Sequence, residues 1–138
     1  DVLGKAIVFL TFYRGGFDRE SARYLEALAG AHQRLKGLGV EVVAVTPELP
    51  EKVKATAVAL HLPFTVLSDP GLKVTRQYDV YDPAQEWCWP AGFVIARDGV
   101  IGYAYRGLSP PNTPPLPYLI KRLEQMGAQG PGATAAAV

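Results

Sequence analysis

The chain has 138 residues, of which 49% are hydrophobic and 20% charged, a balance typical of one globular domain with a single core. Its formal net charge of +1 gives no general attraction to nucleic acid or anionic membranes, and no apolar run approaches the roughly 20 residues that span a bilayer. The single cysteine, Cys88, excludes a disulfide within these residues and a thiol-rich metal site.

The first half of the chain alternates strand and helix signals. Residues 5–13 (KAIVFLTFY) are apolar on both strand faces, which predicts an interior strand of a sheet that is covered on both sides. After two glycines, Asp18 is a good helix N-cap, and the helical spacing of apolar residues predicts a helix to about Lys36. Residues 40–46 (VEVVAVT) predict a second strand, parallel to the first because a helix joins them.

The second half adds shorter elements and a hairpin. Pro50 suits a first helical position, and residues 64–67 (FTVL) predict a short strand. The following SDPG predicts a helical turn through Leu72 to Tyr78, capped by its aspartate. The Asp-Gly pair at 98–99, between two strand-forming runs, predicts a β-hairpin. A proline-rich stretch then leads to a final helix.

The order of these elements predicts the fold class. It is β-α-β-α, an inserted helical segment, and then β-β-α, which favours an α/β protein with a central mixed β-sheet flanked by helices, as in the thioredoxin-like fold. We expect a single domain over residues 1–126. Residues 127–138 hold too few large apolar side chains to pack, so we expect a disordered tail there.

Residues 12–21 read FYRGGFDRES. They resemble the F-Y-R-G-x-W-C-P-Y-C phrase of the peroxiredoxin-like branch of the alkyl hydroperoxide reductase and thiol-specific antioxidant (AhpC/TSA) family. Phe17 stands where that phrase has tryptophan, and Asp18 and Ser21 stand where it has its two cysteines. Within the resemblance, both active-site cysteine positions are therefore degenerate.

Two later stretches extend the resemblance over nearly the whole chain. Residues 63–80 (PFTVLSDPGLKVTRQYDV) are similar to the family's F-x-x-L-S-D-P segment, and residues 89–105 are similar to its segment of cis-proline, strand, D-G turn and strand. The resemblance implies a thioredoxin-like fold, antioxidant thiol-disulfide oxidoreductase activity, a thiol reductant as partner, and Pro90 as the cis-proline.

The chemistry of that family needs a sulfur atom that this site lacks. A reactive cysteine works as its thiolate, which the first turn of a helix stabilises through the helix dipole and unpaired amides. Asp18 places a carboxylate in that niche, but a carboxylate forms neither a sulfenic acid nor a mixed disulfide. We therefore predict a redox-degenerate member of the family with negligible peroxidase turnover.

Two alternatives remain open from the sequence. Cys88 lies two residues before Pro90 and is either a one-cysteine nucleophile that uses an external thiol or a small buried hydrophobic residue. The second alternative is that the chain is a binding module, in which the groove beside Pro90 and aromatic residues such as Trp89 hold a peptide or protein partner. Arg14, near the glycines, either holds an anion at the helix start or forms a structural ion pair.

Few other partners are expected. Neither histidine is spaced for a metal site, so we expect no metal and no cofactor, and the low net charge argues against nucleic acid and membranes as partners. We expect a cytoplasmic location. The start at Asp1 rather than Met indicates a processed or excised chain.

Overall fold

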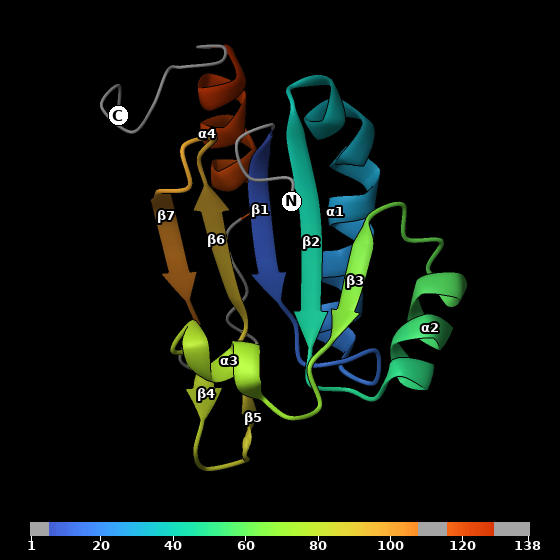
Figure 1. The fold of residues 1–138 in the computed structure, drawn as a ribbon. Coiled ribbons are helices and arrows are strands. Elements are labelled where there is room, and N and C mark those ends of the chain that lie inside the picture. Colours follow the sequence, from blue (N-terminus) through green and yellow to red (C-terminus); the bar gives the residue numbers. More distant parts are fainter. Residues whose placement is uncertain (1–5, 108–115, 129–138) are drawn as a thin grey trace.

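The computed structural model describes residues 6–107 and 116–128, and a five-stranded sheet lies at their centre (Figure 1). The strand order is β3-β2-β1-β6-β7. The strands are β1 (Ile7–Phe12), β2 (Val40–Thr46), β3 (Thr65–Ser68), β6 (Ala91–Ile95) and β7 (Ile101–Arg106). Strands β1, β2 and β3 are parallel, whereas β6 runs antiparallel to both β1 and β7. The predicted thioredoxin-like α/β fold with a mixed sheet is confirmed.

Strand β1 is the centre of the sheet. All of its residues are buried, because it pairs with β2 on one side and β6 on the other and both of its faces are covered. Phe9, for example, lies beside Val42 and Val94 and is fully buried. Its successive side chains alternate between two separate apolar clusters, as the pleat of a strand requires.

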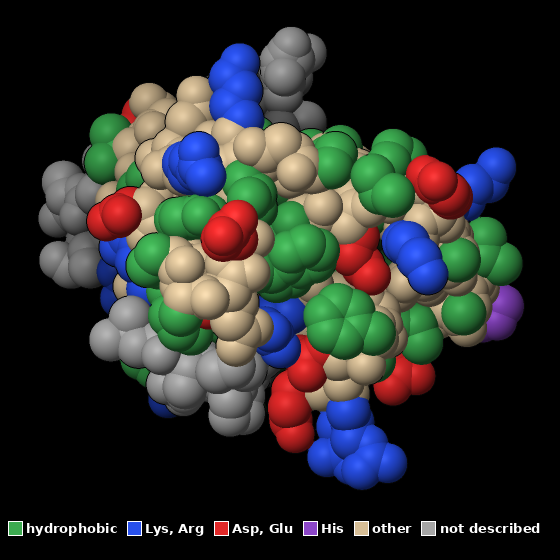
Figure 2. Space-filling view, turned by 90° about the horizontal axis from the view of Figure 1, so that it is seen from below, with side chains coloured by type: hydrophobic (Ala, Val, Ile, Leu, Met, Phe, Trp, Pro, Cys, Tyr) green, Lys and Arg blue, Asp and Glu red, His purple; other side chains and the backbone are tan. Residues whose placement is uncertain are grey.

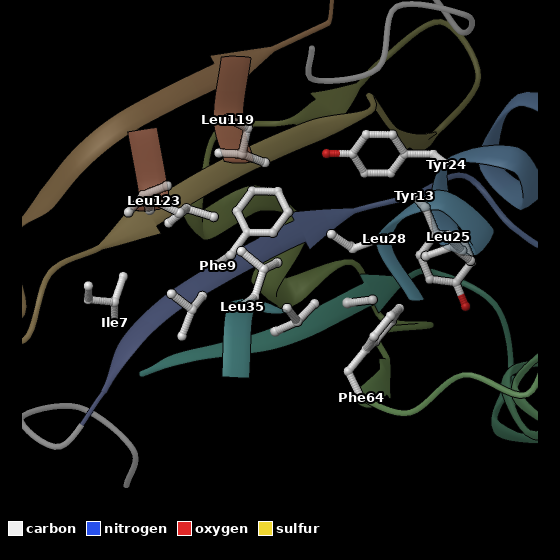
Figure 3. Close-up of a cluster of buried hydrophobic side chains, with 14 residues drawn as sticks. Ile7, Phe9, Tyr13, Tyr24, Leu25, Leu28, Leu35, Phe64, Leu119 and Leu123 are labelled. Carbon is white, nitrogen blue, oxygen red and sulfur yellow. The ribbon is translucent and has the colours of Figure 1, made fainter. Parts of the chain in front are cut away.

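Helices α1 (Arg19–Gly37) and α4 (Leu116–Ala128) cover one face of the sheet. Figure 3 shows Phe9 packed between side chains of both helices, with Leu119 and Leu123 from α4 and Leu28 and Leu35 from α1. An ion pair between Arg34 and Glu124 also joins the two helices. Helix α4 extends two residues into the stretch that was expected to be a disordered tail, and the remaining residues of that stretch, 129–138, lie outside the described residues.

The opposite face carries smaller elements. These are α3 (Lys73–Gln77) and a two-stranded hairpin of β4 (Tyr81–Asp82) and β5 (Trp87–Cys88), while α2 (Pro50–Ala59) flanks the edge strand β3. Apolar side chains of the α3 segment and of the hairpin pack with Phe12 and Phe93 in the second cluster. Helices on both faces were expected, but strands as short as β4 and β5 have no periodicity that a sequence pattern reveals. Within the described ranges, no helix is long and apolar enough to cross a membrane.

Two predicted turns can be compared with the structure. The hairpin between β6 and β7 is confirmed, with Gly99 at φ +88° and the Val100 amide donating to the Asp98 carboxylate at 3.0 Å. The helical turn after the SDPG sequence begins later than predicted, at Lys73. Leu72 before it adopts a left-handed conformation, and the Asp69 carboxylate reaches forward to the amides of the first helical turn.

Candidate functional site

The carboxyl ends of the parallel strands β1, β2 and β3 meet at one edge of the sheet, the lower end in Figure 1. The loop into α1 follows β1, Glu48 follows β2 after one intervening residue, and Asp69 follows β3 directly. Such an edge is a usual place for binding sites in open α/β sheets. Figure 2 looks onto this end of the molecule, where hydrophobic side chains gather and acidic side chains lie among them.

Asp18 caps the N-terminus of α1, as predicted. Its Oδ2 accepts hydrogen bonds from the Ser21 amide at 3.2 Å and from the Ser21 hydroxyl at 2.7 Å. Its own amide donates to the Gly15 carbonyl at 3.1 Å, which closes the turn before the helix. The carboxylate therefore occupies the position where the helix dipole and a free first-turn amide favour a negative charge.

Arg14 is held by partners at the start of α1 and in the β4–β5 hairpin. One guanidinium nitrogen lies 3.9 Å from Asp18 Oδ1, and the other terminal nitrogen donates to Gln85 Oε1 at 2.7 Å. The Arg14 amide donates to the Ser21 hydroxyl at 3.2 Å, and its carbonyl accepts from the Trp87 indole at 2.7 Å. Arg14 thus ties the start of α1 to the β4–β5 hairpin.

Cys88 lies on the other side of β1 from the helix cap. Its sulfur is 3.4 Å from the Tyr13 carbonyl, and the residue is only 1% exposed. The Tyr13 carbonyl and the Arg14 amide belong to one trans peptide unit, so they point in opposite directions. Because that amide meets Ser21, the sulfur and the cap lie on opposite sides of the same peptide. Cys88 also packs in the cluster on the sheet face away from α1.

The Cys88 thiol is strongly held in its neutral form. Burial is the main cause that raises its pKa to about 12, and the carboxylates of Asp69 and Asp82 add to the rise, while the Arg14 guanidinium opposes it. At neutral pH the thiolate, which is the reactive species, is therefore nearly absent.

This raised pKa predicts how stability depends on pH. The unfolded chain releases the thiol proton near pH 8.5 and the folded chain only near pH 12, so Cys88 lowers the free energy of unfolding as pH rises through that window. Between pH 8 and pH 10.5 we expect the wild type to lose on the order of 2 kcal/mol more than Cys88→Ala. Urea unfolding of both proteins at the two pH values measures this, and a difference that stays constant would contradict it.

The peptide bond before Pro90 is trans, so the expected cis-proline is wrong. Pro90 is buried, its carbonyl accepts from the Gly107 amide at 2.8 Å, and the Trp89 amide donates to the Val80 carbonyl at 2.8 Å. The chain therefore runs extended from β5 into β6 with its backbone groups paired. Trp89 is half-buried in this segment.

A groove of about 500 Å³ opens between the start of α1 and α2, and it is lined by Trp87 rather than by Trp89 or Pro90. It is lined by Gly16 and Phe17 before α1, by Glu48 after β2, and by side chains of α2. Glu48 was not predicted from the sequence as a site residue, although its place just after a buried strand is a usable signal. Within residues 6–107 and 116–128 no cluster of acidic, histidine or cysteine side chains is arranged to hold a metal ion.

Solved structures with similar folds include AhpC and peroxiredoxin proteins. The structure of Enterococcus faecalis AhpC matches with a TM-score of 0.84 and 24% sequence identity, covering 97% of this chain and 83% of that one. The structure of a mutant PrxQ of Xylella fastidiosa matches with a TM-score of 0.74 and 15% identity, covering 91% of this chain and 78% of that one. At these identities the likeness establishes the fold.

Sequence comparison establishes the family. The chain is 34% identical over 111 residues to the selenocysteine-containing peroxiredoxin PrxU of Peptoclostridium acidaminophilum, covering 75% of this chain and 54% of that protein. It is 30% identical over 105 residues to the chloroplastic peroxiredoxin Q of Populus jackii, covering 74% of this chain and 48% of that protein. The chain thus spans about half the length of these relatives. The AhpC/TSA family model matches residues 1–104, and the chain belongs to the AhpC/TSA family.

Proposed function

We propose that this chain is a redox-degenerate member of its family, in which the helix terminus that would carry a peroxide-reducing thiol carries a carboxylate cap instead. The observation that supports this most strongly is the pairing of Asp18 with both the amide and the hydroxyl of Ser21. A carboxylate at that place supplies the charge that stabilises the helix end, but no sulfur that a peroxide can oxidise.

The placement of Cys88 supports the same proposal over the one-cysteine alternative. A peroxidatic thiol must ionise and must meet the peroxide, whereas Cys88 is sealed in an apolar cluster with a pKa raised to about 12 by burial. Arg14, which lies beside the helix start, is already paired with Asp18 and Gln85.

Peroxide consumption tests the proposal. Purified wild type and Cys88→Ala are supplied with hydrogen peroxide or an organic hydroperoxide and with dithiothreitol or a thioredoxin system as reductant. We expect both proteins to consume peroxide at the rate of the buffer blank, while an active peroxiredoxin run beside them gives clear turnover. Turnover in the wild type that disappears in Cys88→Ala would instead establish the one-cysteine mechanism.

A further inference from the structure

We propose that the groove between Phe17 and Trp87 binds the side chain of an arginine or lysine, presented by an extended, otherwise apolar segment of a partner protein. This inference does not depend on the loss of thiol chemistry, because it uses a different set of side chains.

The groove is lined in part by large apolar side chains that the fold leaves in solvent. Phe17 is 67% exposed and Leu49 is 53% exposed, and both line the groove. Exposed large apolar residues that gather in one concave place are typical of interaction sites, and a volume of about 500 Å³ accommodates one long side chain with its apolar neighbours.

An acidic group lies at the base of this apolar surface. Glu48 lines the groove yet is only 9% exposed, and its Oε1 accepts a hydrogen bond from the Gly16 amide at 3.1 Å. Its backbone is fixed as well, since its carbonyl accepts from the Ser68 hydroxyl at 2.5 Å and its amide donates to Thr46 Oγ1 at 3.4 Å. The carboxylate therefore keeps one position.

That carboxylate lacks a cationic partner within the part of the chain that the structure describes. No lysine, arginine or histidine of residues 6–107 and 116–128 forms an ion pair with it, although Lys52 also lines the groove. A carboxylate that is mostly removed from water is costly without a charged partner. A cation brought by a ligand therefore gains more binding free energy here than beside an exposed carboxylate.

The aromatic walls favour the same kind of ligand. The Trp87 indole nitrogen donates to the Arg14 carbonyl at 2.7 Å, which holds the ring in place beside the groove. Tryptophan and phenylalanine faces attract cations, and arginine stacks on them better than lysine does. The combination of a fixed carboxylate with two aromatic walls selects a basic side chain with a long apolar stem.

Binding of short peptides tests this proposal. The probes are capped pentapeptides of the form Leu-Phe-X-Leu-Ala, with arginine, lysine, citrulline or glutamate at X, and the readout is the amide NMR shift of Gly16 together with the indole signal of Trp87. We expect saturable shifts with the arginine and lysine peptides, at least about tenfold weaker binding of the uncharged citrulline peptide, and no binding of the glutamate peptide.

Matched variants separate the carboxylate from general packing. Glu48→Gln keeps an oxygen that accepts from the Gly16 amide, and we expect it to bind the arginine and citrulline peptides equally weakly. Glu51→Gln, at an exposed position in the first turn of α2, should bind as the wild type does. Phe17→Ala removes an exposed side chain, so it leaves the fold intact, and it should weaken binding of the arginine peptide severalfold.

The proposal is overturned if the arginine peptide produces no saturable shift up to millimolar concentration. It is equally overturned if citrulline replaces arginine without loss, or if Glu48→Gln binds as tightly as the wild type. None of these outcomes bears on peroxide turnover, which is measured separately.

Discussion

Replacing Asp18 by cysteine, in a Cys88→Ala background, should create a thiol that is alkylated at pH 7.5 more than about 10³ times faster than native Cys88. The pKa of Cys88 is raised to about 12, whereas a thiol at the half-buried N-cap of α1 should ionise at or below the ordinary value of about 8.5. The ratio of thiolate fractions at pH 7.5 gives the expected factor. Iodoacetamide labelling followed by intact mass measurement determines both rates.

A second thiol on the same helix provides the control. Ala27 is exposed in the middle of α1, so Ala27→Cys in the same background reports an ordinary thiol far from the helix end. The dipole of α1 and the Arg14 guanidinium should bring the alkylation midpoint of Asp18→Cys to a lower pH than that of Ala27→Cys. A midpoint at the same or a higher pH would show that this helix terminus is not an anion niche. Loss of the carboxylate cap should also cost about 0.5–2 kcal/mol of stability.

Replacing Asp69 by alanine should destabilise the protein by about 3 kcal/mol, because three donors lose their acceptor inside the fold. The Asp69 carboxylate accepts from the Thr75 amide and hydroxyl, both at 2.8 Å, and from the Val74 amide at 3.2 Å. Asp69 is 7% exposed and Thr75 is fully buried, so water does not replace the lost acceptor. Urea unfolding monitored by circular dichroism measures the change in the free energy of unfolding.

Two comparisons show whether burial sets this cost. Asp98 also accepts a backbone amide, that of Val100 at 3.0 Å, but it does so in an exposed turn, so Asp98→Ala should cost less than about 1 kcal/mol. Asp69→Asn keeps one acceptor oxygen, so its loss in the free energy of unfolding should lie between those of the two alanine variants. If Asp69→Ala costs no more than Asp98→Ala, the carboxylate does not organise the segment after β3.

Elements whose sequence signals are local could be predicted from the sequence. The apolar run of β1, the Asp18 cap and the Asp98–Gly99 turn each depend on a few adjacent residues, and all three lie where they were predicted. The resemblance between residues 12–21 and the family phrase likewise pointed to the helix start as the site.

What the sequence did not reveal depends on contacts between distant segments. The side of β1 on which Cys88 lies follows from the β4–β5 hairpin, whose two-residue strands carry no pattern. The Pro90 carbonyl pairs with Gly107 and the Trp89 amide with Val80, and the groove at Glu48 exists only because α2 packs beside the loop that opens α1. The pattern of apolar residues within one segment gives no information about such contacts between distant segments.

The most direct test of the central claim is the intact mass of the native protein after exposure to hydrogen peroxide together with dimedone, which traps sulfenic acids. If this chain has no thiol poised for peroxide chemistry, its mass stays unchanged under conditions that label an active peroxiredoxin completely. Rapid and stoichiometric addition of one dimedone to Cys88 would contradict the account.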